Sequence, residues 1–327
     1  MKKNKSKGID VSILILTWNG LNIIKKTLPS FLKLKTKYNY EIIVVDNASE
    51  DNTAEFLKKN YPSVKIFRND SNLSCSGWDP AIKVCKGRYI MFIPNDVEAT
   101  PDFLDHLVDT MEQDNNVGMT IPVLFDYYNR KLVETGPDWI SRSFYTGRYQ
   151  GEFKGDVKEA KEILGGSAGL VRKSALDTVG YFYDCDFFVQ AQDPDLGLRL
   201  RLIGLRSMYV PSSKMYHMES ATLKKGYSPK NTYYMERNLL FMFLKICSLP
   251  RIVLLLPYII LMRLFALLRD ILLLRFKIAI ARVKGWLWLL FHASIVYKKR
   301  KQTQKLRKVK DSYIFKIFSE KRILTGT

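Results

Sequence analysis

A short, mainly apolar run that recurs between helical patterns constrains this fold more than any other feature. Val11–Leu16, Glu41–Val45 and Tyr89–Ile93 each predict a strand that is buried on both faces. Helical patterns follow the first two runs, and Val64–Phe67 predicts a further strand. Strands that alternate with helices in this way indicate an α/β fold around a mostly parallel, doubly wound sheet.

Aspartates follow two of these strands. Asp46 comes directly after the second run, and Asp96 follows Pro94, which cannot donate to a strand ladder and so ends the third. Ligands of open α/β sheets bind at the carboxyl ends of the strands, where a carboxylate can hold a divalent cation against a diphosphate. The alternative is that each aspartate caps the helix after it, and for Asp46 alone the two interpretations are evenly balanced.

Two later stretches also contain candidate site residues. Gly165, Gly166 and Ser167 would let the backbone approach a ligand closely, or they form no more than a tight turn. Asp193 precedes Pro194, a residue suited to the first turn of a helix. Its carboxylate therefore fits either the N-cap of that helix or a general base.

The predicted helix ends at Gly204, and His217 follows a short predicted strand at Met208–Pro211. A lone histidine is more often structural than functional. His217 would be a site residue only if it binds the same cation as Asp96.

The positive charge of the chain is concentrated in its last part. The net charge is +20, and residues 246–327 contain 18 Lys and Arg against 3 Asp and Glu. These basic residues alternate with Leu, Ile, Phe and Trp, a combination that favours an anionic lipid surface over nucleic acid. The longest uninterrupted apolar run, Ile252–Met262, is shorter than the ~20 residues of a spanning helix. We therefore predict interfacial amphipathic helices, with packing on the first domain or a dimer interface as the alternative.

The four cysteines lie in no metal-binding pattern. Free thiols and the absence of a signal-peptide pattern near Met1–Gly8 predict that the enzyme portion lies in the cytoplasm. The predicted organisation is one α/β domain over residues 1–245 followed by a helical membrane-association region over residues 246–327.

Six segments together resemble glycosyltransferases of family 2, which have the GT-A fold, and in particular bacterial rhamnosyltransferases of surface-polysaccharide assembly. The segments span about 230 residues, and their order and spacing make the resemblance specific. They are Val11–Asn19, Val44–Asp51, Ile93–Val97, Asp186–Arg201, His217 and Tyr233–Asn238.

The resemblance implies an inverting transfer of a sugar from a UDP- or dTDP-sugar, with dTDP-rhamnose as one candidate. Asp193 would be the general base, and Asp96 would hold Mg²⁺ or Mn²⁺ with His217 as a further ligand. Arg237 would steady the diphosphate. The resemblance also suggests the remaining donor-side residues Thr17, Asn19, Asp46 and Asn47, and the acceptor-side residues Gly166, Ser167 and Gln192. The acceptor would be a polyprenyl-diphosphate-linked saccharide at the cytoplasmic face of the membrane, with a homo-oligomer left open.

The sequence departs from the family pattern at several positions. Gln192 stands where the family usually has Glu, and Pro94 stands where its metal motif commonly begins with Asn or Asp. Ser74 and Asp79 replace the usual Gly and Asn of a loop. These departures keep open a non-catalytic scaffold that binds nucleotide or partners. The pI of about 9.6 also suggests a nucleic-acid-binding protein, but the sequence contains no recognisable nucleic-acid-binding motif.

Overall fold

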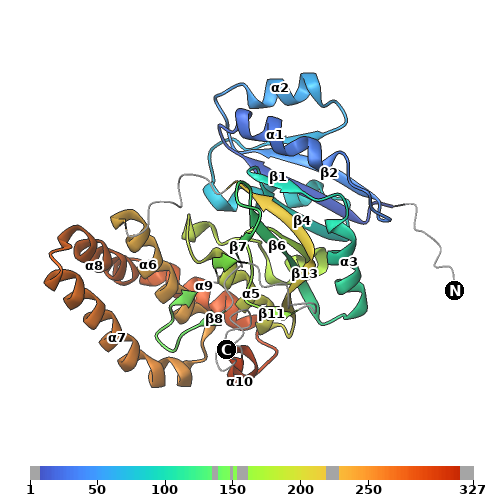
Figure 1. The fold of residues 1–327 in the computed structure, drawn as a ribbon. Coiled ribbons are helices and arrows are strands. Elements are labelled where there is room, and N and C mark those ends of the chain that lie inside the picture. The colour runs from blue at the N-terminus through green and yellow to red at the C-terminus, as the bar shows by residue number, and fades with distance from the viewer. Residues whose placement is uncertain (1–7, 135–138, 148–149, 153–160, 219–227, 317–327) are drawn as a thin grey trace.

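The computed structural model describes residues 8–134, 139–147, 150–152, 161–218 and 228–316 (Figure 1). Most of the residues used to exclude a signal peptide, Met1–Lys7, lie outside this description. A mixed β-sheet with helices on both faces forms the first part of the chain, and a group of helices lies beside it (Figure 1).

The predicted parallel sheet is confirmed for the first strands. The strands β1 (Val11–Thr17), β2 (Tyr40–Asp46), β3 (Lys65–Arg68) and β4 (Tyr89–Pro94) are parallel and lie in the order β3-β2-β1-β4. The order reverses direction at β1, so the crevice between the ends of β1 and β4 is the place where such sheets bind ligands.

The sheet continues beyond β4 with antiparallel partners. β12 (Gly169–Arg172) lies antiparallel to β4 and to β6 (Val117–Asp126). β13 (Arg206–His217) contains the predicted Met208–Pro211 strand and runs parallel to β6. The other strands of the sheet are β5 (Val97–Ala99), β7 (Leu132–Glu134), β10 (Gln150–Glu152) and β11 (Lys161–Ile163), while β8 (Trp139–Ile140) and β9 (Thr146–Gly147) form a separate pair.

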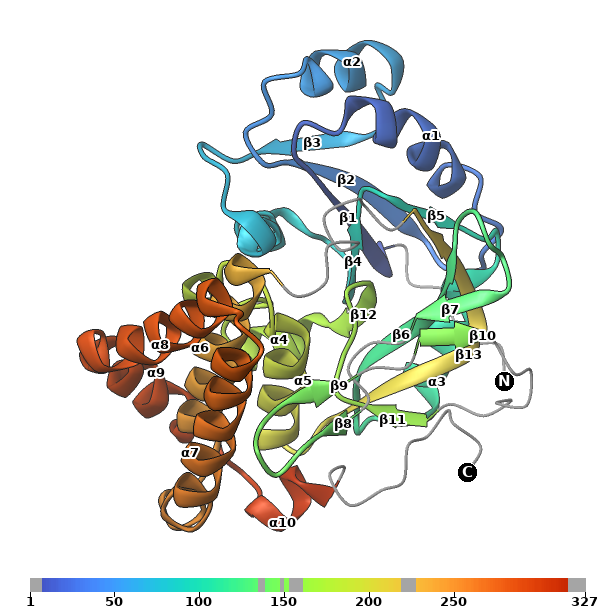
Figure 2. The ribbon, with the colours of Figure 1, turned by 60° about the vertical axis from the view of Figure 1, so that its left-hand side comes forward.

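Alternation along the buried strands gives the sheet two apolar faces. Ile13 and Ile15 of β1 pack in the same cluster as α1 (Leu21–Phe31) and α3 (Phe103–Gln113), whereas Leu14 belongs to the opposite cluster. Figure 2 shows this arrangement of helices about the strands. The remaining helices are α2 (Thr53–Asn60) on the first face, and the 3₁₀ segment η1 (Ser74–Val84), α4 (Lys173–Val179) and α5 (Gln192–Leu202) on the second.

α2 begins after Asn52, whose side chain makes no capping bond, and the Asp51 carboxylate accepts the backbone N–H of Thr53 at 3.3 Å. The predicted start of the helix that ends at Gly204 was wrong in detail. α5 begins at Gln192, so Asp193 lies in the first turn and is not the N-cap. Its predicted end is confirmed, because Gly204 follows the helix with a φ of +90°.

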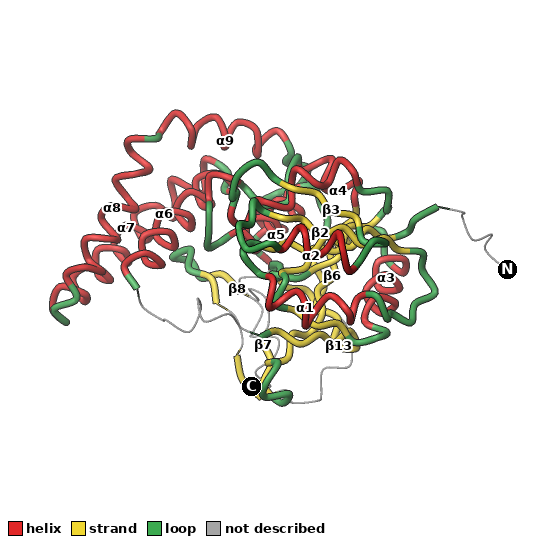
Figure 3. The backbone as a smooth tube through the Cα atoms, turned by 90° about the horizontal axis from the view of Figure 1, so that it is seen from above, coloured by secondary structure: helices red, strands yellow, loops and turns green. Residues whose placement is uncertain are grey.

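The helices α6 (Pro229–Ile246), α7 (Leu249–Leu272), α8 (Phe276–Phe291) and α9 (Ala293–Lys305) form what we call the helical unit, and Figure 3 shows them beside the sheet. Two short segments, η2 (Cys185–Phe187) and α10 (Asp311–Ile314), complete the elements. The predicted boundary at residue 245 falls one residue before α6 ends. Because the sheet domain and the helical unit pack together, that boundary stays a prediction.

The apolar run at Ile252–Met262 led to an underestimate of helix length. α7 is a continuous helix of 24 residues, or roughly 36 Å, despite Pro257 within it. Among the described residues, α7 is long and apolar enough to cross a membrane, and the bent pair α8 and α9 would count as a second such segment if taken together. Arg263 does not interrupt its outer surface, because this side chain is buried.

The helical unit buries charged side chains. The Glu236 carboxylate of α6 binds Arg263 of α7 at 2.6 Å and also Arg282 of α8. Arg282 in turn binds Asp270 at 2.7 Å, and all four side chains are at most 5% exposed. The prediction that Arg263 and Arg282 face lipid phosphates was therefore wrong, since both neutralise buried carboxylates.

Candidate active site

The ends of β1 and β4 are joined by side chains. The Asn95 amide donates to the Thr17 hydroxyl at 2.9 Å, and Thr17 is buried. Asn19 has a φ of +47°, and its backbone N–H donates to the Ser49 hydroxyl at 2.9 Å. Thr17 and Asn19 thus lie at the reversal point of the strand order, beside the exposed Trp18.

Asp46 and Asn47 are buried at the adjacent strand end. Asp46 accepts the Ser49 N–H at 3.0 Å and forms an ion pair with Arg68. Asn47 accepts the backbone N–H of Leu73 at 3.1 Å and donates to the Ser74 carbonyl at 3.2 Å. Both side chains therefore shape the loop over the strand ends, and their contact with a donor nucleoside stays a prediction.

Asp96 and His217 meet at the edge of the sheet because β5 pairs with β13. His217 lies opposite Val97 in that pairing, and its Nε2 is 3.4 Å from Asp96 Oδ2. Asp96 Oδ1 is buried and has no hydrogen-bond partner in the part of the chain that the structure describes. An unpaired buried carboxylate oxygen beside an imidazole is a donor set that Mg²⁺ or Mn²⁺ would satisfy.

A second acidic group lies in the segment before α5. Ligand atoms of Asp184, Cys185 and Asp186 are within 4.8 Å of one another, a spacing that a divalent cation could use. Lys245 and Lys299 already bind Asp184, at 2.8 and 2.7 Å. Burial alone would raise the pKa of Asp184, but these two ammonium groups outweigh burial and hold that pKa well below its usual range. Because its charge is balanced, this group fits a cation less well than Asp96 and His217 do.

The predicted base, Asp193, is held by Tyr183. Tyr183 is fully buried and donates its hydroxyl to Asp193 Oδ1. Burial, reinforced by the charge of Asp193, raises the pKa of Tyr183 well above its usual value, so this tyrosine stays protonated and donates. The hydrogen bond therefore fixes the orientation of the Asp193 carboxylate.

The glycine segment connects Asp193 to the end of β4. A Cβ on Gly165 would lie 2.5 Å from the Asp193 carbonyl oxygen, so only glycine permits this contact. The same segment leads into β12, where Gly169 pairs with Phe92 of β4. Asp193 and the strand end that carries Asp96 are thereby brought to one region of the molecule.

The three predicted acceptor-side residues have different surroundings. A Cβ on Gly166 would lie 2.7 Å from the Ile121 side chain, so this glycine is needed for packing. Ser167 is partly exposed. Gln192 is 7% exposed, and its buried amide nitrogen has no hydrogen-bond partner within the described residues. Acceptor binding by these residues stays a prediction.

Arg237 contacts backbone carbonyls in this structure. Its guanidinium donates to the carbonyl oxygens of Asp186 and Phe187, at 2.7 and 2.8 Å, and it stacks over Trp288. It therefore holds the segment before α5, and its contact with a diphosphate stays a prediction. Sequence reasoning also missed Tyr183, whose partner Asp193 is 10 residues away, and Asn238, whose partners are 48 to 51 residues away.

A parallel β3-β2-β1-β4 sheet with carboxylates at one edge and an antiparallel β12 beside β4 defines the GT-A class of glycosyltransferases. The fold is similar to GalNAc-T7 crystallised with UDP, GalNAc and Mn²⁺, with a TM-score of 0.56 and 17% identity over 73% of this chain and 48% of that one. It is also similar to residues 1–349 of S. aureus TarS in complex with UDP, with a TM-score of 0.53 and 16% identity over 73% of this chain and 67% of that one.

The model of Glycosyl transferase family 2 matches residues 12–180, and the chain belongs to this family. It is 27% identical to an N-acetylglucosaminyl-diphospho-decaprenol L-rhamnosyltransferase of Mycobacterium tuberculosis, over 57% of this chain and 69% of that protein. It is 26% identical to the uncharacterized protein y4gI of Sinorhizobium fredii, over 71% of this chain and 27% of that protein. A poly-beta-1,6-N-acetyl-D-glucosamine synthase of Staphylococcus aureus is 24% identical, over 65% of this chain and 51% of the synthase. The predicted fold and enzyme class are confirmed.

Proposed function

We propose that this glycosyltransferase moves a sugar, with inversion, from a UDP- or dTDP-sugar to a polyprenyl-diphosphate-linked saccharide in cell-surface polysaccharide synthesis. The observation that supports it most is the unpaired Asp96 oxygen beside His217, at the same sheet edge as the segment that positions Asp193. The TarS complex with UDP and the name of the mycobacterial relative support the donor and acceptor classes. dTDP-rhamnose remains one candidate donor.

On the donor side, Asp96 and His217 would hold Mg²⁺ or Mn²⁺. A bound divalent cation offsets the negative charge that develops on a departing nucleoside diphosphate. Thr17, Asn19 and the loop held by Asn47 would enclose the nucleoside.

On the acceptor side, Asp193 accepts the proton of the attacking hydroxyl as its oxygen bonds to the anomeric carbon. The bond from that carbon to the diphosphate breaks on the opposite face, and the electron pair leaves with the nucleoside diphosphate. A sugar hydroxyl is a weak nucleophile, so a positioned base contributes about 10²–10⁴-fold. The hydrogen bond from Tyr183 keeps the base oriented for this step.

The helical unit supports a membrane location. Large apolar side chains on the outer surface of α7 are more than 50% exposed, while two of its charged residues, Arg263 and Asp270, are buried. These exposed side chains are Leu249, Val253, Leu254, Leu261, Leu264, Phe265, Leu268 and Leu272. Exposed lysines of α9, among them Lys298 and Lys301, suit anionic headgroups. We place the enzyme at the cytoplasmic face, peripheral or monotopic, where a lipid-linked acceptor would lie.

The test is nucleoside diphosphate release from a panel of nucleotide sugars, with crude lipid-linked acceptors and purified protein in detergent. We expect release from one donor, its loss in EDTA, and a decrease of about 10²–10⁴-fold in Asp193→Asn. The exposed Asp177→Asn is the matched control and should keep full activity. If a nucleotide binds while no donor is consumed, the non-catalytic scaffold is correct instead.

A further inference from the structure

The segment between η2 and α5 has an unusual backbone. Phe188, Gln190 and Ala191 all have positive φ angles, of 60°, 71° and 63°. Residues other than glycine rarely adopt a backbone conformation with positive φ, and each one that does costs on the order of 1–3 kcal/mol of conformational free energy. Other contacts must therefore hold the segment in place, and strain of this kind is concentrated at functional sites.

Two adjacent residues of α6 hold it. The Asn238 amide donates to the carbonyl oxygens of Phe187, Val189 and Gln190, at 3.0, 2.7 and 2.9 Å. Arg237 donates to the Phe187 carbonyl as well, and its own Nε donates to Asn238. Both side chains are buried, so four hydrogen bonds from the helical unit determine the conformation of a segment that ends at the predicted base.

The held segment presents an exposed aromatic ring five residues before Asp193. The Phe188 ring is 44% exposed and stacks on Tyr234 of α6, with ring centroids 5.6 Å apart and an interplanar angle of 26°. Gln192, one residue before Asp193, has a buried amide nitrogen without a partner among the described residues. An exposed aromatic ring and an unpaired donor thus lie on either side of a strained turn that leads to the base.

We propose that Phe188 and Tyr234 bind the sugar ring of the acceptor, and that Gln192 donates a hydrogen bond to an oxygen of that sugar. A sugar has an apolar C–H face, which suits an aromatic ring, and polar edges, which suit an amide. A hydrocarbon chain would leave the Gln192 donor unpaired, which favours the sugar as the occupant. This inference rests on the proposed function, because it assigns the acceptor side of the same site.

The test measures the initial rate against the concentration of crude lipid-linked acceptor, at a saturating concentration of the donor found above. We expect Phe188→Ala and Tyr234→Leu to raise the KM for acceptor about ten-fold, which corresponds to the loss of one aromatic contact. The KM for donor and the slow hydrolysis of donor by water should be unchanged. Phe188→Tyr should restore the KM to within about two-fold. Tyr297→Ala, which changes a more exposed aromatic on α9, is the control.

Each result decides the question. An unchanged KM for acceptor in both Phe188→Ala and Tyr234→Leu would overturn the subsite. A parallel loss of donor hydrolysis and of thermal stability would assign these rings a structural role and would overturn it as well. If the wild-type protein consumes no donor, the proposed function is wrong. If the wild-type protein is active and Phe188→Ala leaves the KM for acceptor unchanged, the proposed function still holds and only the subsite is refuted.

Discussion

The helical unit leaves many more large apolar side chains exposed than the sheet domain does, although both bury charged residues such as Glu236 and Asp195. The side chains of β1 and β4 that form the two apolar faces, such as Ile13 and Phe92, are fully buried, and the lysines of α1 lie outside. In the helical unit, Glu236 and Asp270 are buried while Leu254 and Leu272 are more than 70% exposed. The surface of the sheet domain therefore suits water, whereas the outer surface of the helical unit suits an apolar environment.

Both oxygens of the buried Glu236 carboxylate have partners. Glu236 binds two arginines and also accepts hydrogen bonds from Trp286 Nε1 at 3.0 Å and from the Tyr145 hydroxyl at 2.7 Å. Ion pairs of this kind are costly to bury, and hydrophobic residues of similar volume would often be as stable. An arrangement with charge inside and leucine outside is favourable where the outer surface contacts lipid.

The largest effect should follow from breaking the ionic cluster. Glu236→Gln would leave Arg263 and Arg282 with one buried carboxylate fewer, at a cost of about 3–5 kcal/mol in the free energy of unfolding. Denaturant unfolding in detergent measures it. Asp177→Asn, which breaks the exposed pair with Lys173, should change the free energy by less than about 1 kcal/mol. Equal effects of the two substitutions would contradict the contrast between buried and exposed pairs.

A smaller effect is expected on the outer surface of α7. Leu254→Ser with Leu261→Ser should weaken binding to anionic vesicles by at least about 100-fold, because each leucine contributes roughly 1.5–3 kcal/mol when it enters lipid. Flotation with vesicles measures the bound fraction. The matched control, Leu32→Ser with Val84→Ser, changes exposed residues of the sheet domain and should leave binding unchanged. If both pairs float alike, α7 does not face lipid.

The smallest effect concerns pH at the junction of the two regions. The pKa of Asp184 is lower in the folded protein than in the unfolded chain, so its stabilisation is complete above about pH 5 and is lost as pH falls. The stability difference between wild type and Asp184→Asn should narrow by about 1 kcal/mol between pH 7 and pH 3. Unfolding by denaturant at several pH values measures this, and a difference independent of pH would disprove the role of Lys245 and Lys299.

Local pattern was enough to predict the parallel strands and the residues at their ends. Val11–Leu16 and Tyr89–Ile93 each lie within a buried strand, and Asp96 lies two residues beyond the end of the second, at Pro94. Whether a charged residue of a helix faces the interior or the outer surface could not be predicted. Arg263 is buried with its ion-pair partner Glu236, which is distant in sequence. The true contacts of Arg237 were missed for the same reason, since its partners are backbone carbonyls about 50 residues away.

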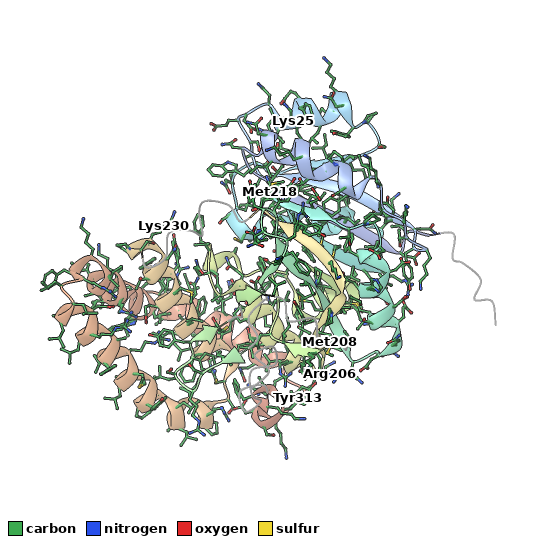
Figure 4. All side chains as sticks on the ribbon, viewed as in Figure 1. Lys25, Arg206, Met208, Met218, Lys230 and Tyr313 are labelled. Atoms are coloured by element: carbon green, nitrogen blue, oxygen red, sulfur yellow. The ribbon has the colours of Figure 1, made fainter. Side chains whose placement is uncertain are left out.

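The aromatic surface was also outside the reach of sequence patterns. Nothing in the letters Phe187-Phe188-Val189 indicates a left-handed backbone, and the sequence alone favours a buried aromatic there. The positive φ values are imposed by Asn238, which lies in a different helix. Figure 4 shows the side chains of the sheet domain and the helical unit together, with Lys230 near the start of α6 and Met208 on β13.

The last helices also determine when the protein becomes competent during its synthesis. Lys299 of α9 binds Asp184, and Arg201 of α5 donates to the carbonyl of Ile314 in α10 at 2.8 Å. A ribosome must therefore translate α9 before the segment at 184–193 has all these partners, and α10 before Arg201 has its own. With the proposed membrane location, the nascent chain would reach the bilayer before it could transfer sugar.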